Sequence, residues 1–144
     1  MTAPGPHPDS SLPPIGSFVA GRYEVKAVRG AGMMGVVLEA RDGRSGALVA
    51  LKILKPEICS SPELRARLVR EAAIVSRLTS PHVVRVFDFG DTAEGLPFFA
   101  MELLEGADLD TLLREARPFS TQEAVSWVRQ ACAGVARSEE RRVG

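Results

Sequence analysis

The sequence has few of the features that mark exported, disulfide-bonded or membrane-spanning proteins. Its two cysteines, Cys59 and Cys132, lie far apart and have neither the Cys-x-x-Cys spacing nor that of a metal site. No run approaches about 18 consecutive apolar residues, and residues 1–5 lack the basic and apolar regions of a signal peptide. We therefore expect a reduced, cytoplasmic setting and no membrane segment in the chain shown.

An excess of charge of either sign is also missing. Lysine and arginine number 18, aspartate and glutamate number 18, and the formal net charge is zero. The field of the whole chain therefore gives no reason to expect a nucleic-acid partner, and an anionic ligand would have to be held by local groups. With 144 residues, the chain has the length of one small domain.

The most informative segment is glycine-rich and reads Gly30-Ala31-Gly32-Met33-Met34-Gly35-Val36-Val37. Glycines at this spacing let the backbone approach a ligand closely, so that amide groups can point at phosphate oxygens. The same G-x-G-x-x-G pattern also opens dinucleotide-binding βαβ units. The residues that follow decide between these two interpretations.

Those residues predict a β-hairpin. Residues 36–40 and 47–54 read as strands, and residues 42–46 read as the turn between them. A dinucleotide site would need a helix directly after the glycines and an acid about 20 residues later. Neither is present, and no Gly-Lys-Ser/Thr ending marks a Walker-type loop. The charged residue on the following strand is instead Lys52.

Alternation along the strands places Lys52 on a definite face. Residues 22–28 alternate apolar and charged side chains, and on the strand at 47–54 Lys52 shares a face with Ala50. Ala50 would leave room for a flat base, Val37 would lie beside it, and the ammonium could reach phosphate oxygens. The alternative is a lysine on a strand edge that faces water.

A helix is predicted from the cap at Ser61 to about Leu78. On a helical wheel, Glu71 falls inside the apolar stripe of this helix. A buried carboxylate needs a partner, and Lys52 is the candidate. The alternative partners are the neighbouring arginines, Arg67 and Arg70.

The remaining segments predict two more strands and two helices. Residues 82–90 and 96–103 read as strands, which completes a five-stranded antiparallel sheet of α+β class packed by one helix. Asp108 is the N-cap of a helix to about residue 115, and a capping box opens another that runs to residue 136. His82, alone before a strand, is expected to be a cap or a surface residue.

Three features together resemble the N-terminal lobe of the eukaryotic-like serine/threonine protein kinases of bacteria. They are the glycine-rich loop, the Val49-Ala50-Leu51-Lys52 strand and the helix carrying Glu71. The resemblance runs from about residue 21 to residue 136. It implies a kinase N-lobe and hinge at residues 17–104 and the start of the C-lobe at residues 105–136.

In that family, the lysine is set against the α- and β-phosphates of ATP by an ion pair with the glutamate. The resemblance therefore implies that Lys52 and Glu71 act in catalysis and that residues 30–35, with Val37 and Ala50, bind the nucleotide. It further implies that Met101 lies at the back of the adenine pocket.

The same resemblance assigns the hinge. It implies that the main chain of Glu102 and Leu104 pairs with the adenine edge and that Asp108 binds the ribose hydroxyls. The capping role of Asp108 is compatible with this assignment.

The second half of the kinase machinery is missing from the sequence. No His-Arg-Asp catalytic loop or Ala-Pro-Glu segment is present, and Asp88-Phe89-Gly90 lies upstream of the hinge, where it cannot be the metal-binding motif. We expect ATP as cofactor, Mg²⁺ ligands outside this sequence, an inactive fragment and an unknown protein substrate. The alternatives are a pseudokinase or interaction module and, more weakly, a small-molecule phosphotransferase of kinase-like fold.

The two ends of the chain read differently from the rest. Residues 1–16 are rich in proline and are expected to form a disordered leader. Residues 137–144 are abruptly charged and resemble the in-frame translation of a sequencing adapter, so we expect a non-native tail. The alternative is a natural charged helix end.

Overall fold

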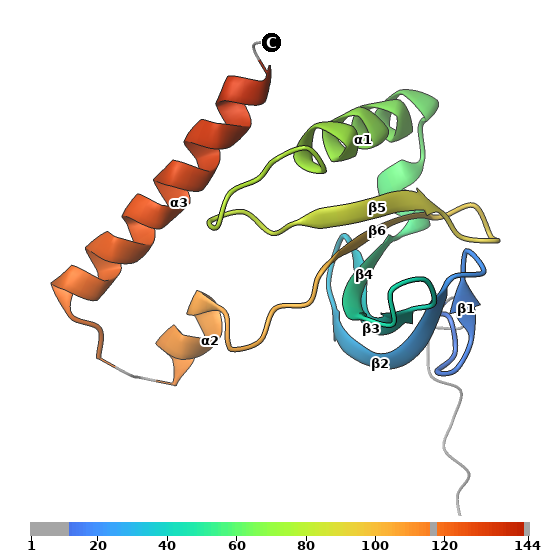
Figure 1. Ribbon diagram of the computed structural model, residues 1–144, viewed down its shortest axis with the longest axis horizontal. Coiled ribbons are helices and arrows are strands. Elements are labelled where there is room, and N and C mark those ends of the chain that lie inside the picture. The colour runs from blue at the N-terminus through green and yellow to red at the C-terminus, as the bar shows by residue number, and fades with distance from the viewer. Residues whose placement is uncertain (1–11, 116–117, 143–144) are drawn as a thin grey trace, which may run out of the picture.

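The computed structural model describes residues 12–115 and 118–142, so most of the predicted leader lies outside the described residues. The strands are β1 (Phe18–Val19), β2 (Tyr23–Ala31), β3 (Gly35–Asp42), β4 (Leu48–Leu54), β5 (Val86–Asp91) and β6 (Pro97–Glu102). The helices are the 3-10 helix η1 (Pro56–Cys59), α1 (Pro62–Val75), α2 (Leu109–Arg114) and α3 (Thr121–Arg142). Figure 1 shows a curled sheet with α1 beside β5, and α2 and α3 beyond the end of β6.

The strands form one antiparallel sheet of six strands in the order β1-β2-β3-β4-β6-β5. The five predicted strands are all present, and β1 is the addition. It has only two residues, too few to show an alternating pattern. Val19 pairs with Tyr23 across a turn in which Ala20 and Gly21 have positive φ angles of 50° and 63°.

The apolar core lies on one face of this sheet, as the pleat requires. Its fully buried residues include Val25, Leu38 and Leu51, and Tyr23 packs edge to face against Phe98 with ring centroids 5.8 Å apart. Val49, Leu51 and Ile53 are buried and share one face of β4, so Lys52 and Ala50 lie together on the other face, as predicted. The opposite face is less buried.

The first helix starts as predicted and ends earlier. The hydroxyl of Ser61 accepts a hydrogen bond from the amide of Leu64 at 3.1 Å, and Pro62 occupies the first turn. Helix α1 ends at Val75, and Leu78 is buried in the turn that follows. The helix contacts β5, η1 and α3.

The last two helices begin at the predicted caps. Asp108 accepts a hydrogen bond from the amide of Thr111 at 2.7 Å, and Ser120 and Glu123 form the reciprocal bonds of a capping box. The ring of Phe119 packs edge to face on Trp127, with centroids 4.8 Å apart. Helix α3 continues past residue 136 to Arg142.

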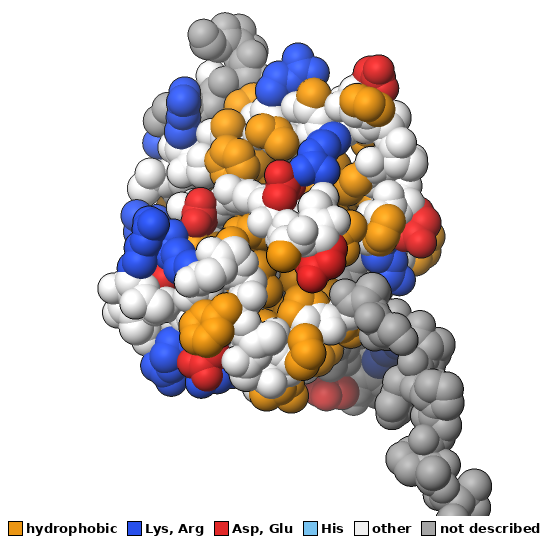
Figure 2. All heavy atoms as spheres, turned by 90° about the vertical axis from the view of Figure 1, so that its right-hand side faces the viewer, with side chains coloured by type: hydrophobic (Ala, Val, Ile, Leu, Met, Phe, Trp, Pro, Cys, Tyr) orange, Lys and Arg blue, Asp and Glu red, His pale blue; other side chains and the backbone are white. Residues whose placement is uncertain are grey.

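Residues 12–16, assigned from the sequence to the leader, contact the sheet. Leu12 packs against the core, and the amide of Gly16 donates to the carbonyl of Val25 at 2.8 Å. No helix among the described residues is long and apolar enough to cross a membrane. On the face that Figure 2 shows, acidic and basic side chains are interspersed with apolar ones.

Candidate functional site

Strand register brings several predicted site residues together on the less buried face of the sheet. Directly opposed residues of antiparallel neighbours point to the same face. Gly30 lies opposite Val37, Val37 lies opposite Lys52, and Lys52 lies opposite Phe99. This row crosses four strands, β2, β3, β4 and β6.

A second row runs beside the first. Ala50 lies between Glu39 on β3 and Met101 on β6. Since Ala50 and Lys52 are two residues apart, both rows share one face. Val37, Lys52 and Met101 are all half-buried, which leaves part of each side chain open to a ligand.

The glycine-rich loop is a tight connection between β2 and β3, closed by a hydrogen bond from the amide of Gly32 to the carbonyl of Gly35 at 2.9 Å. Its glycines serve different purposes. A Cβ on Gly35 would lie 2.1 Å from the carbonyl oxygen of Ile53, so the sheet itself requires glycine there. A Cβ on Gly30 or Gly32 would meet nothing within 4 Å. The space beside these two glycines is open, and Met33 at the tip is 92% exposed.

Arg29 and Glu39, two residues that the sequence did not assign to the site, form an ion pair beside it. Ala27 lies opposite Glu39, and a register irregularity follows between Val28 and Gly30, around Arg29. The guanidinium of Arg29 is therefore held against β3.

The predicted ion pair between Lys52 and Glu71 is not formed in this structure. The carboxylate of Glu71 instead accepts from Nε of Arg67 at 3.0 Å, and its side chain is 42% exposed. Among the described residues, no ion pair involves Lys52. Helix α1 contacts β5, η1 and α3, and Glu71 lies beside Arg67 one turn earlier on its own helix.

The predicted hinge follows β6. Glu102 ends this strand, and its amide donates to the carbonyl of Arg85 at 2.9 Å. Leu104 lies beyond the strand and is 62% exposed, and its amide has no hydrogen-bond partner in the described part of the chain. The bond from Thr111 lowers the pKa of Asp108, whose role as a helix cap is confirmed.

A partly buried polar cluster, missed from the sequence, joins β2 to β3 and β5. Arg22 binds both carboxylate oxygens of Asp42, at 2.7 and 2.9 Å, and also donates to Asp88 at 2.9 Å. The hydroxyl of Tyr23 donates to the same oxygen of Asp88 at 2.8 Å. Asp88 is thus held in a structural cluster by Arg22 and Tyr23.

This cluster shifts the ionisation of its members. The hydrogen bonds from Arg22 hold the pKa of the Asp42 carboxyl well below its usual range, and bonds from the amide of Arg44 and the hydroxyl of Ser45 act in the same direction. Burial, together with the bond to Asp88, raises the pKa of Tyr23. No group of three or more His, Cys, Asp or Glu residues able to hold a metal ion is found within residues 12–115 and 118–142.

The family model for the protein kinase domain matches residues 23–143. The chain belongs to the protein kinase family. Serine/threonine-protein kinase PknD of Mycobacterium tuberculosis (strain CDC 1551 / Oshkosh) is 38% identical over 125 residues, which are 87% of this chain and 18% of PknD. Serine/threonine-protein kinase PknE of Mycobacterium bovis is 40% identical over 110 residues, which are 76% of this chain and 19% of PknE.

Solved kinase structures agree with this assignment. The PknI kinase domain of Mycobacterium tuberculosis superposes with a TM-score of 0.83 and 26% identity, and the match covers 90% of this chain and 52% of that domain. The curled sheet with few helices is a kinase N-lobe followed by the start of a C-lobe. The chain spans about half of the solved domain and under a fifth of PknD or PknE.

Proposed function

We propose that this chain is the ATP-binding part of a protein kinase that transfers the γ-phosphoryl group of MgATP to serine or threonine hydroxyls. The observation that carries the proposal is the register of the sheet, which aligns Gly30, Val37 and Lys52 across three strands. A phosphate chain lying under the glycine-rich loop would then meet the ammonium group of Lys52. The proposed division is an N-lobe and hinge at residues 17–104 and a C-lobe start at residues 105–136.

The described residues fit an adenine nucleotide. The open space beside Gly30 and Gly32 suits close approach of phosphates to amide groups. Val37 and Ala50 would enclose the base, and Met101, which pairs with Ala50, would lie behind it. The hinge would contribute main-chain groups, and the unpartnered amide of Leu104 is such a donor.

Lys52 and Glu71 have linked roles in this proposal. Lys52 neutralises and positions the phosphates. Glu71 would leave Arg67, pair with Lys52 and hold it in place. An exposed pair one helical turn apart contributes only about 0.3–0.5 kcal/mol, so breaking the pair between Glu71 and Arg67 has a low cost. A bound Mg²⁺ would neutralise charge on the phosphates, and its ligands are not found among the described residues.

The second candidate is a pseudokinase or kinase-like interaction module, which keeps the fold without catalysis. The contact of Glu71 with Arg67 favours it, because it leaves Lys52 without its glutamate. We further propose a cytoplasmic location, which the free thiols of Cys59 and Cys132 support.

The test is an amide NMR titration of the chain with a non-hydrolysable ATP analogue. We expect shifts at residues 30–37, at Lys52 and at Leu104, and weaker binding by about tenfold for Lys52→Ala. The matched control is Lys55→Ala, because Lys55 is exposed just after the same strand. Shifts confined to other regions, or equal affinity for both variants, would refute the nucleotide site.

A further inference from the structure

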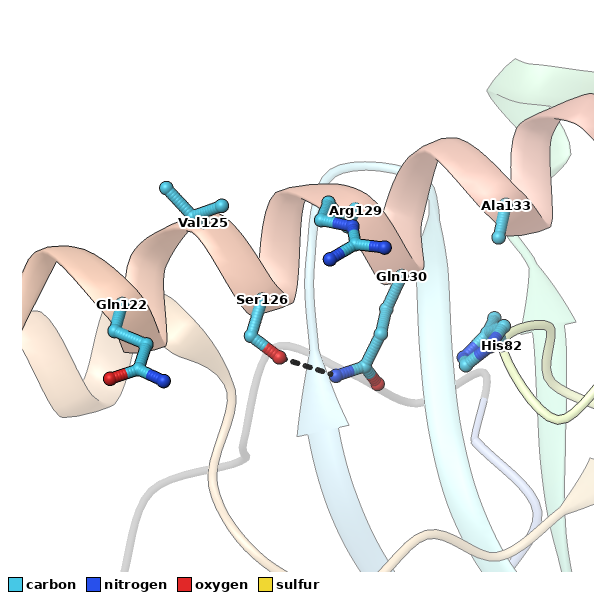
Figure 3. A pocket seen from close by; sticks show the side chains of 7 residues that line it. All are labelled: His82, Gln122, Val125, Ser126, Arg129, Gln130 and Ala133. Atoms are coloured by element: carbon cyan, nitrogen blue, oxygen red, sulfur yellow. Dashed lines mark hydrogen bonds between the residues drawn. The ribbon is translucent and has the colours of Figure 1, made fainter.

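A cleft of about 440 Å³ lies away from the proposed nucleotide site, between α3 and the segment that precedes β5. Figure 3 shows its polar side chains: Gln122, Ser126, Arg129 and Gln130 come from α3, and His82 comes from the opposite segment. The cleft takes no part in the proposed nucleotide binding.

A close backbone contact fixes the end of this cleft at His82. A Cβ on Gly134 would lie 2.8 Å from the carbonyl oxygen of His82 and 3.2 Å from Cγ2 of Val83. Only glycine lets α3 come so near to this segment. The imidazole of His82 and the side chains of α3 are therefore held at a set spacing.

The lining carries positive charge without negative charge. Arg129 supplies a guanidinium cation, and no Asp or Glu lines the cleft. Three arginines on the helices have acidic partners: Arg67 binds Glu71, Arg114 binds Asp110 and Arg137 binds Glu140. In the part of the chain that the structure describes, the guanidinium of Arg129 has no such partner.

The polar groups around Arg129 can donate hydrogen bonds. The side-chain amide of Gln130 donates to the hydroxyl oxygen of Ser126 at 3.3 Å, so the hydroxyl hydrogen of Ser126 is available to a ligand (Figure 3). Gln122 supplies an amide group and His82 an imidazole. A guanidinium amid several further hydrogen-bond donors suits a group with three anionic oxygens better than a carboxylate with two.

The length of the cleft suits a short peptide. Residues 122–133 of α3 span about 16 Å at about 1.5 Å per residue. An extended chain of about five residues covers the same distance at about 3.3 Å per residue. Val125 and Ala133 add apolar surface to the lining.

We propose that this cleft binds an extended peptide segment that carries a phosphorylated serine or threonine. The guanidinium of Arg129 binds two phosphate oxygens, and the hydroxyl of Ser126 donates to the phosphate. His82 and Gln122 lie on either side of it along the cleft.

The experiment measures fluorescence anisotropy of labelled five-residue peptides with the 144-residue chain. The central residue is phosphothreonine, threonine or glutamate, and it is flanked by two alanines on each side. We expect the phosphothreonine peptide to bind at least about tenfold more tightly than the other two, and Arg129→Gln to remove most of this difference. The control is Arg114→Gln, which removes an arginine of α2 outside the cleft and should leave binding unchanged.

Three outcomes would overturn the proposal: equal binding of the phosphothreonine and glutamate peptides, equal loss in both arginine variants, or no binding. Competition by inorganic phosphate as strong as by the peptide would show a bare anion site and would refute the peptide. Circular dichroism checks that Arg129→Gln folds. Ser126→Ala is the milder second variant and should weaken phosphopeptide binding severalfold without affecting the threonine peptide.

Discussion

The carboxylate of Glu71 binds Nε of Arg67 one turn earlier in α1, at 3.0 Å, and leaves Lys52 without an acidic partner in the described part of the chain. Both side chains of this pair are largely solvated, 71% exposed for Arg67 and 42% for Glu71. Such a pair is weak because water screens it and because two long side chains must be ordered. Lys52 with bound phosphates can compete for Glu71.

The first prediction follows from this competition. Arg67→Gln frees Glu71, so we expect ATP-analogue affinity to rise up to about twofold, the equivalent of about 0.4 kcal/mol. The free energy of unfolding should change by less than about 0.5 kcal/mol. Titration with the analogue measures the affinity, and urea unfolding measures the stability. Arg70→Gln is the control, because its guanidinium bonds to the carbonyl of Ala66 rather than to Glu71. An equal gain in both variants would contradict the competition.

The second prediction separates two glycines of one loop. Gly35→Ala brings a Cβ within 2.1 Å of the carbonyl oxygen of Ile53, and β3 must move away from β4. We expect unfolding to become easier by about 2 kcal/mol, measured by urea denaturation. Gly32→Ala meets nothing within 4 Å, so its stability should be near that of the parent chain. Gly32→Ala should instead weaken nucleotide binding.

Reversed results would refute this division of roles. If Gly32→Ala were the less stable variant, the loop would be held by contacts that the structure does not show. If Gly32→Ala bound the nucleotide as well as the parent chain, the open space beside this glycine would have no part in the site.

The third prediction concerns the loss of stability at low pH. Arg22 holds the pKa of Asp42 in the folded chain well below its usual range. In the unfolded chain the pKa of this carboxyl is about 4. The ionised Asp42 therefore stabilises the fold above about pH 4, and this contribution is lost as the pH falls below that value. Arg22→Gln should destabilise the chain by about 3 kcal/mol at pH 7, since it leaves a buried carboxylate without its cation. It should also flatten the dependence of stability on pH between about 4 and 2.

The control for this prediction is Arg41→Gln. Arg41 is a neighbouring exposed arginine whose guanidinium donates to the carbonyl of Gly46. Urea unfolding of both variants from pH 7 to 2 is the measurement. Equal acid dependence in Arg22→Gln and the parent chain would remove Asp42 from its role.

What could be predicted from the sequence was local. Alternation along β4 correctly places Lys52 and Ala50 on one face, because the strand pleat depends only on neighbouring residues. Caps at Ser61, Asp108 and Ser120 were equally local, since each acts within one turn. The family resemblance extended these features to a kinase N-lobe.

What could not be predicted depends on how elements pack. A helical wheel shows which side of α1 carries Glu71 but not where the helix lies relative to the sheet, and in the structure α1 lies against β5 and Glu71 binds Arg67. Arg22 and Asp88 are 66 positions apart, and no local pattern connects them. Gly134 did offer a signal, because a glycine inside a helix often marks a close contact.

The last prediction is that the 144-residue chain transfers no phosphate. Its sequence contains no His-Arg-Asp loop that would supply the base, and among the described residues no acidic cluster could hold Mg²⁺. Lys52 and the glycine-rich loop can position a nucleotide, but positioning alone leaves the attacking hydroxyl without a base. Incubation with radiolabelled ATP and a mixed serine/threonine peptide library should give no label above that of Lys52→Ala. The NMR titration on the same sample shows whether nucleotide is bound. Transfer by the parent chain that Lys52→Ala abolishes would overturn this prediction and would require a base and metal ligands within these residues.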